Sequence, residues 1–182
     1  MNIRTYSYES GRFFLQPGSK PYIFYILLKP EALQAIGVLK NILDVFASKG
    51  IPLLQLKVSS PPMAKITIIV IAELREKESH KDSLLAELST VKYVEDVRVV
   101  PPLAEGIVVD TLSFPLTVMG ERSVIMRRTV YEGFIKGGWS RFGTAYAAML
   151  YLMGFEAGRS AYRSQSKISG DPDVLLKMAS AL

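Results

Sequence analysis

The fold is decided by residues 21–51, which read PYIFYILLKPEALQAIGVLKNILDVFASKGI. The stretch opens at residues 22–28 with a continuous run of β-branched and aromatic side chains, which is typical of a buried strand. After Pro30, apolar residues recur at three- and four-residue steps from Leu33 to Ala47, which predicts one apolar stripe along a helix. Gly50 then ends that helix, and Ile51 begins a second strand.

The pattern continues outward to residue 102. Residues 51–59 and 65–73 are predicted strands separated by a Pro-Pro turn, residues 83–91 a second helix, and residues 94–100 a fourth strand. The order strand, helix, strand, strand, helix, strand predicts an α+β, ferredoxin-like βαββαβ domain over residues 21–102. Its sheet has both helices on one face, so the other face requires a cover, either a second copy or an appended segment.

The first helix carries a family resemblance in the run AIGVLKNILDVFASKGI, residues 35–51. A Gly-Val-Leu at the helix start and a Gly-Ile before the next strand resemble an ACT domain, a regulatory module. The resemblance implies a homodimer that binds an amino-acid effector at the loop before the helix, through Ile36, Gly37, Val38 and Leu39. A glycine there admits close approach, and free helix amides suit a carboxylate. The alternative is that Gly37 only permits helix–strand packing.

Two segments flank this domain. Residues 1–20 form a leader in which aromatic residues on both sides of Ser10-Gly11 predict a loose hairpin. Residues 103–182 predict a strand at 107–109, a hairpin formed by residues 114–119 and 123–128, a helix at 130–136 broken by Gly137-Gly138, an apolar helix at 143–158 and a last helix at 173–181. The helix at 143–158 is apolar nearly all round and is therefore expected to be buried.

This second module carries a resemblance of its own. The runs FGTA at residues 142–145 and MGFEAGR at residues 153–159 are similar to the 4-vinyl-reductase-type small-molecule-binding domain. That domain also serves as the sensor of aromatic-responsive bacterial transcription activators, which implies a role in transcription regulation. A pocket of this kind would be lined by Tyr131, Trp139, Tyr146, Met149 and Phe155. The alternative is that these side chains form ordinary core.

The amino-acid composition excludes several kinds of functional site. The chain has 182 residues and no cysteine, which excludes disulfides, thiolate metal sites and cysteine nucleophiles. The single histidine, His80, lies in a charged loop without a metal-binding neighbour. No catalytic cluster or cofactor motif is present, so we expect a non-enzymatic protein without a cofactor. No apolar run is long enough for a membrane span, and the expected compartment is the cytoplasm.

A net charge of +5 suits a chain that touches anions without requiring one. Cations interleaved with aromatic residues in the second half suggest nucleic-acid binding as the alternative function. The candidates are Arg127, Arg128, Lys136, Arg141, Arg159 and Arg163. A solvated basic face explains the same residues. Two classes therefore stay open, a dimeric sensor of a small-molecule effector and a nucleic-acid-binding regulator.

Overall fold

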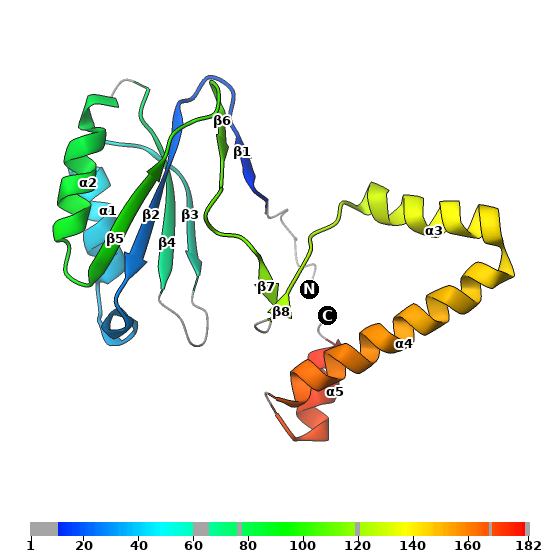
Figure 1. Cartoon of the computed structure of the whole chain (residues 1–182). Coiled ribbons are helices and arrows are strands. Elements are labelled where there is room, and N and C mark those ends of the chain that lie inside the picture. The colour runs from blue at the N-terminus through cyan, green and yellow to red at the C-terminus, as the bar shows by residue number, and fades with distance from the viewer. Residues whose placement is uncertain (1–10, 60–65, 76–77, 119–120, 168, 181–182) are drawn as a thin grey trace, which may run out of the picture. The chain divides into compact units, whose positions relative to one another are not determined.

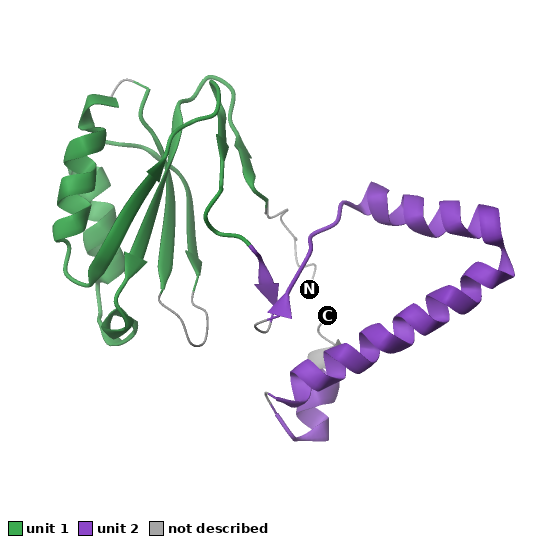
Figure 2. Ribbon diagram, in the orientation of Figure 1, with its two compact units in different colours: residues 1–114 green, residues 115–182 purple. Residues whose placement is uncertain are grey.

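A computed structural model describes residues 11–59, 66–75, 78–118, 121–167 and 169–180. The chain divides into two compact units, residues 1–114 and 115–182 (Figure 2). Residues 103–114, which the sequence assigned to the second module, belong to unit 1, because strand β6 (Ile107–Val109) pairs there with β1 (Phe13–Leu15). The two units are described separately below.

Unit 1 is built on a four-stranded antiparallel sheet with the strand order β3-β4-β2-β5. Its strands are β2 (Pro21–Leu28), β3 (Leu53–Ser59), β4 (Thr67–Glu73) and β5 (Val94–Val100). Helices α1 (Val38–Ser48) and α2 (Lys81–Thr90) cover one face (Figure 1). This order and these crossovers make the unit an α+β, ferredoxin-like fold, and they confirm the fold class predicted from the sequence.

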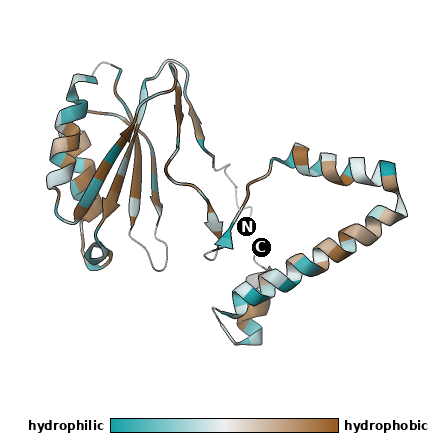
Figure 3. Ribbon diagram, viewed as in Figure 1, coloured by the Kyte–Doolittle hydropathy of each residue, from teal (hydrophilic) through white to brown (hydrophobic). Residues whose placement is uncertain are grey.

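Alternation along β2 produces two cores. Phe24 and Ile26 point to the helices and pack with Ile42 and Phe46 of α1, and the Phe24 and Phe46 rings meet edge-to-face with centroids 5.2 Å apart. The alternate residues of β2 point to the opposite face. Burial on both faces explains why residues 22–28 form a continuous apolar run. Figure 3 shows this run as one of the most hydrophobic segments of the chain.

The first helix is shorter than its apolar spacing predicts. Residues Pro30–Gln34 form the 3-10 turn η1, and α1 begins only at Val38. Gly37 separates the two elements with a φ of 84°, a left-handed conformation that glycine adopts at no steric cost. A continuous helix from Leu33 is therefore wrong, because that backbone conformation interrupts the α-helical path.

A two-stranded ribbon covers part of the other sheet face. Val108 of β6 is fully buried and packs with Ile23, Tyr25, Ile69 and Ile71 of the sheet. Phe13–Leu15 pairs with β6 on one edge, and the other arm of the predicted leader hairpin falls in residues 1–10, so that hairpin stays a prediction. Residues 1–10 lie outside the described part of the chain. The cover that the sequence required is thus supplied in part by the segment that follows Pro101-Pro102.

Unit 2 is mostly helical. It contains the short strands β7 (Thr117–Val118) and β8 (Glu121–Arg122), and the helices α3 (Arg128–Phe142), α4 (Thr144–Ser166) and α5 (Pro172–Ser180). Gly137-Gly138 do not break α3, which ends instead at Gly143, where φ is 53°. The predicted second arm of the hairpin at 123–128 is also wrong, because β8 ends at Arg122.

The prediction that the apolar helix is buried is not confirmed either. Tyr151, Leu152, Met153 and Phe155 of α4 are all more than half exposed, and Gln165 is the one buried residue among the described side chains of unit 2. Figure 3 shows the hydrophobic middle of α4. The described part of unit 2 therefore has no hydrophobic core of its own, which is the physical reason that periodicity failed to predict burial here.

Candidate functional site

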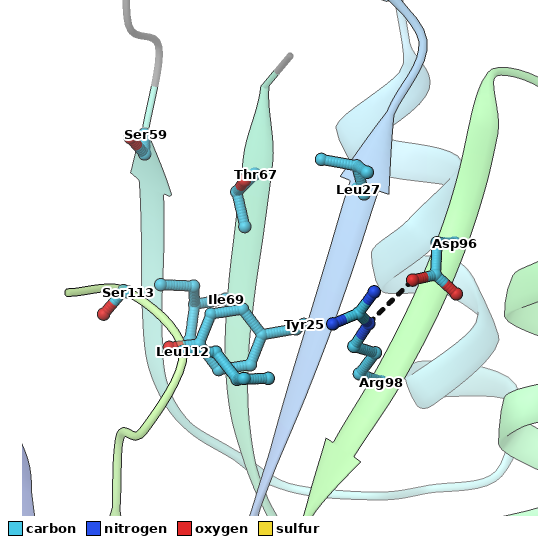
Figure 4. A pocket seen from close by; sticks show the side chains of 9 residues that line it. All are labelled: Tyr25, Leu27, Ser59, Thr67, Ile69, Asp96, Arg98, Leu112 and Ser113. Carbon is cyan, nitrogen blue, oxygen red and sulfur yellow. Dashed lines mark hydrogen bonds and ion pairs between the residues drawn. The ribbon is translucent and has the colours of Figure 1, made fainter. Parts of the chain in front are cut away.

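A cavity of about 310 Å³ lies on the sheet face opposite the two helices, which we call the open-face cavity. Its lining comes from all four sheet strands and from the segment that follows β6 (Figure 4). The lining residues are Tyr25, Leu27, Ser59, Thr67, Ile69, Asp96, Arg98, Leu112 and Ser113. All belong to unit 1.

Strand register brings the floor of the cavity together. Tyr25 of β2 lies opposite Ile69 of β4 on one side and opposite Arg98 of β5 on the other. Paired residues in an antiparallel sheet share a face, so these three side chains project to the same side. Tyr25 and Ile69 are buried and give the cavity an apolar floor. The open face is thus apolar at its centre and polar toward both edge strands.

An ion pair forms the β5 side of the cavity. Arg98 donates from Nε to the Oδ2 atom of Asp96 over 2.8 Å. The two residues are two apart on one strand and therefore project to the same face. Ser59 and Ser113 lie on the opposite side, toward β3 (Figure 4). The cavity thus offers a cation and a carboxylate at one end and hydroxyl groups at the other.

A buried carboxylate fixes the wall formed by residues 110–113. Asp110 is only 5% exposed and accepts hydrogen bonds from the Tyr25 hydroxyl and the Ser113 hydroxyl. It also accepts from the amides of Leu112 and Ser113 over 3.2 and 3.0 Å. Burial of a charge is favourable only with such partners. Asp110 therefore ties the segment before unit 2 to the side chain at the cavity floor.

Arg12 holds the same segment from the other side. Its carbonyl oxygen accepts from the Asp110 amide over 2.7 Å, and its guanidinium carbon lies 3.8 Å from the centroid of the Phe114 ring. A cation stacked on an aromatic face at this distance is stabilising. Residues 110–114, which we call the linker, are thus anchored to unit 1 at both ends.

The loop predicted as an effector site does not line this cavity. Gly37 adopts the left-handed conformation, Ile36 is fully exposed, Leu39 is partly exposed and Val38 is buried in the helix-side core. At the start of α1, the Asn41 amide donates a hydrogen bond to the Gly37 carbonyl oxygen over 3.0 Å. Effector binding at this turn stays a prediction.

Most of the aromatic set predicted in unit 2 is exposed. Tyr131, Trp139, Met149 and Phe155 are each more than half exposed. Tyr146 instead joins two helices, because its hydroxyl donates to the Phe134 oxygen over 3.0 Å. A side chain at Gly138 would overlap the Tyr146 ring, so this glycine permits the close contact between α3 and α4. Pocket formation by these residues, and the second family resemblance, remain predictions.

The predicted basic residues of unit 2 are all exposed. Arg128 and Lys136 flank Glu132, at 2.6 and 3.8 Å, and Arg159 lies 3.7 Å from Glu156. These pairs reduce the positive charge that the side chains present together. Nucleic-acid binding by this set stays a prediction.

A polar cluster elsewhere in unit 1 has a perturbed tyrosine. The Tyr22 hydroxyl donates to Glu78, which also pairs with Lys20. Burial, together with the hydrogen bond and the charge of Glu78, raises the pKa of Tyr22 to about 12. The hydrogen bonds from Lys20 and Tyr22 hold the pKa of Glu78 below its usual value. This cluster joins β2 to η2 (Glu78–His80) and lies outside the open-face cavity.

Sequence reasoning missed Tyr25, Arg98 and Asp110. The apolar run at residues 22–28 predicts a buried strand without indicating which face Tyr25 occupies, and no local pattern singles out Asp110. The available signal was the alternation Asp96-Val97-Arg98-Val99, which places two opposite charges on one face of a strand. In the part of the chain that the structure describes, no three metal-binding side chains gather. The same residues contain no helix with the length and apolarity of a membrane span.

Comparison with known proteins gives only distant likenesses. No family model and no curated protein matches the sequence. Among solved structures, the chain is similar to the C-terminal domain of the MgtC protein of Mycobacterium tuberculosis, with 22% identity and a TM-score of 0.39 over 47% of this chain and 90% of that one. The ACT domain of the GTP pyrophosphokinase of Chlorobium tepidum is 12% identical, with a TM-score of 0.37 over 44% of this chain and 97% of that one.

A third likeness is the regulatory subunit of aspartate kinase from Thermus thermophilus. It is 15% identical, with a TM-score of 0.35, over 50% of this chain and 54% of that chain. Similarity at this level carries no argument about function. The fold assigned to unit 1 rests on its strand order and register.

Proposed function

We propose that this chain is a non-catalytic regulatory protein in which unit 1 binds a small molecule in the open-face cavity and the linker passes its occupancy to unit 2. One observation carries the proposal: Leu112 and Ser113 line the cavity and also belong to the linker, which ends where unit 2 begins at Pro115. A ligand that contacts these residues favours one arrangement of the linker over others, and such differential contact is what shifts a conformational equilibrium.

The size and lining of the cavity support a small-molecule ligand. A volume of about 310 Å³ is at the lower end of the usual range for ligand sites, roughly 300 to 1,000 Å³. An apolar floor with a few polar groups at the rim is the usual composition of such sites. Catalysis is not proposed, because the lining offers one ion pair and several hydroxyl groups, without an activated nucleophile or an acid–base pair.

We further propose that the protein acts in the cytoplasm as a homodimer. Unit 1 leaves several apolar side chains exposed near its β3 edge and around η1, including Leu33, Ile36, Leu56 and Val58. As an edge strand of the described sheet, β3 offers unpaired backbone groups to a second chain. Light scattering after size exclusion is expected to give twice the mass of the 20.2 kDa chain. A monomeric mass at high concentration would contradict this.

The linker supplies the test of regulation. Hydrogen exchange of the intact chain should be measured with and without a ligand found by thermal-shift screening. Binding only to the native state raises the melting temperature in a concentration-dependent way. We expect slower exchange at residues 110–114 and a change in the emission of Trp139, the single tryptophan, which lies in α3 of unit 2. Binding without a change at either place would refute regulation through the linker.

Nucleic-acid binding is the second candidate, supported by the exposure of Arg127, Arg141 and Arg163 together with Tyr162 and Trp139. Contacts to phosphates release counterions, so affinity for an oligonucleotide should fall steeply between about 50 and 200 mM salt. The glutamine variants of Arg127, Arg141 and Arg163 together should abolish such binding. Unchanged affinity of this triple variant would exclude the basic face.

A further inference from the structure

We infer that the open-face cavity takes a small monocarboxylate with an apolar body, whose carboxylate binds Arg98. The inference rests on the proposed function, since it names the ligand chemistry of the same cavity. It is argued from the ion pair at β5, the apolar floor, and the hydroxyl groups toward β3.

The hydrogen bonding of Arg98 leaves the two terminal nitrogens of its guanidinium group available. Only Nε is engaged, with Asp96 Oδ2 at 2.8 Å, and no described residue accepts from the two terminal nitrogens. The side chain is 67% exposed and stands on an edge strand, so it can turn toward a bound anion at little cost. Two parallel N–H groups match the two oxygens of a carboxylate, a pairing that is both strong and directional.

The apolar floor of the cavity favours a ligand that has an apolar part beside its charged group. Tyr25 and Ile69 are buried under the cavity, and Leu27 and Leu112 also line it. The Tyr25 hydroxyl already donates to Asp110, so the phenol is held in place before a ligand arrives. A fixed floor lowers the cost of ordering on binding. A flat ring or a short branched chain placed here would remove apolar surface from water.

Asp96 limits the negative charge that a ligand at Arg98 can carry. Its carboxylate lies beside Arg98 and neutralises part of the guanidinium charge. Asp96 would therefore repel a dianion such as a phosphate monoester more strongly than it repels a monocarboxylate. Toward β3 the cavity presents the hydroxyl groups of Ser59, Thr67 and Ser113. Two strand spacings separate β4 from β5, about 10 Å, so an uncharged hydroxyl at the far end of the ligand would reach Thr67 at this polar rim.

Three probes share one ring and separate these features. They are 3-(4-hydroxyphenyl)propionate, which has the carboxylate, tyramine, which has an ammonium group instead, and 4-ethylphenol, which has neither. Binding to the full chain should be measured by isothermal titration calorimetry at pH 7.5. We expect the propionate to bind at least tenfold more tightly than either of the other probes. Replacement of its carboxylate by a phosphate, in 4-hydroxyphenethyl phosphate, should weaken binding.

The matched variants are Arg98→Gln and Arg75→Gln. Arg98→Gln should weaken the propionate at least tenfold and leave 4-ethylphenol unchanged. Arg75 is also an exposed arginine paired with a carboxylate, Glu105, but it does not line the cavity, so Arg75→Gln should change neither affinity. Arg98→Lys keeps the charge without the fork and should retain part of the binding. Circular dichroism of each variant checks that the fold is intact, and Arg98→Lys carries the test should Arg98→Gln not fold.

The outcomes separate the ligand chemistry from the proposed function. Equal affinity for the propionate and 4-ethylphenol, or undiminished binding by Arg98→Gln, would overturn the carboxylate assignment while leaving the cavity as a ligand site. Tighter binding of the phosphate than of the propionate would overturn it in the same way. If a Leu112→Trp variant, which fills the cavity, still binds the propionate as the natural chain does, the cavity is not the site and the proposed function fails as well.

Discussion

Replacing the buried carboxylate of Asp110 tests whether the linker is fixed by unit 1. In the folded protein this carboxylate accepts two hydroxyl hydrogen bonds and two amide hydrogen bonds, the latter at 3.2 and 3.0 Å. Asn at this position keeps the size of the side chain but has one acceptor oxygen and one donor group. At least one buried donor, the Tyr25 hydroxyl or the Ser113 hydroxyl, then faces an amide N–H instead of an oxygen.

The expected magnitude follows from those contacts. A hydrogen bond to a charged group contributes about 1.5 to 3 kcal/mol, and a buried donor left unsatisfied costs about 1 to 3 kcal/mol. We therefore expect Asp110→Asn to lower the free energy of unfolding of unit 1 by about 2 to 4 kcal/mol. Tyr25→Phe removes a single donor and leaves the other three bonds in place, so its cost should be smaller, about 1 to 2 kcal/mol.

The assay is urea denaturation of the full chain followed by circular dichroism, with hydrogen exchange of β2 and β4 reporting unit 1 separately. The double variant completes a cycle whose coupling energy isolates the Tyr25–Asp110 bond. Asp44→Asn is the matched control, because Asp44 forms only an exposed pair with Lys40, and it should change stability by less than about 0.5 kcal/mol. An Asp110→Asn variant as stable as this control would refute the anchoring of the linker.

Three further predictions concern the stability of unit 1. The raised pKa of Tyr22 favours its neutral form in the folded state, so its contribution to stability is complete below pH 10 and is lost toward pH 12. Tyr22→Phe should remove this loss from the pH profile of urea midpoints. An unchanged profile would contradict the link between Tyr22 and Glu78. Phe46→Ala, at a fully buried ring, should cost about 3 to 5 kcal/mol in urea denaturation, and a cost below about 1 kcal/mol would show that the helix-side core is loosely packed. Gly106→Ala should lower the melting temperature more than Gly18→Ala, since both glycines have positive φ but only at Gly106 would a Cβ lie 2.6 Å from a backbone oxygen; equal shifts would argue against that close approach.

Much of unit 1 follows from local sequence patterns. The apolar run of β2, the stripe of α1 and the alternation of β5 each predict an element, and together they predict the ferredoxin-like order. The interruption before α1 was not predictable from apolar spacing, because Leu33 and Ile36 continue the helical period although both are exposed. Apolar periodicity indicates which residues could share a helix face. The left-handed conformation of Gly37 interrupts the helix, so these residues do not share one.

The candidate site was less predictable, for a reason of distance along the chain. Tyr25 and Asp110 are 85 residues apart, and no local pattern indicates that a hydroxyl of β2 meets a carboxylate after β6. The Asp96 and Arg98 pair was visible as alternation, but its place beside Tyr25 depends on the register between β2 and β5. In unit 2 the apolar run at 143–158 correctly predicted a helix and wrongly predicted its burial.

The elements and the fold class of unit 1 follow from its sequence, because burial on one or both faces imposes apolar periods of two and of three to four residues. The sequence also determined, through its lack of cysteine and its lone histidine, which chemistries are excluded. Three features become visible only in the folded chain: residues 103–114 belong to unit 1, the open sheet face is hollowed, and the linker forms one wall of the cavity. Those features arise from contacts between distant segments, whose register is fixed only when the whole sheet is assembled.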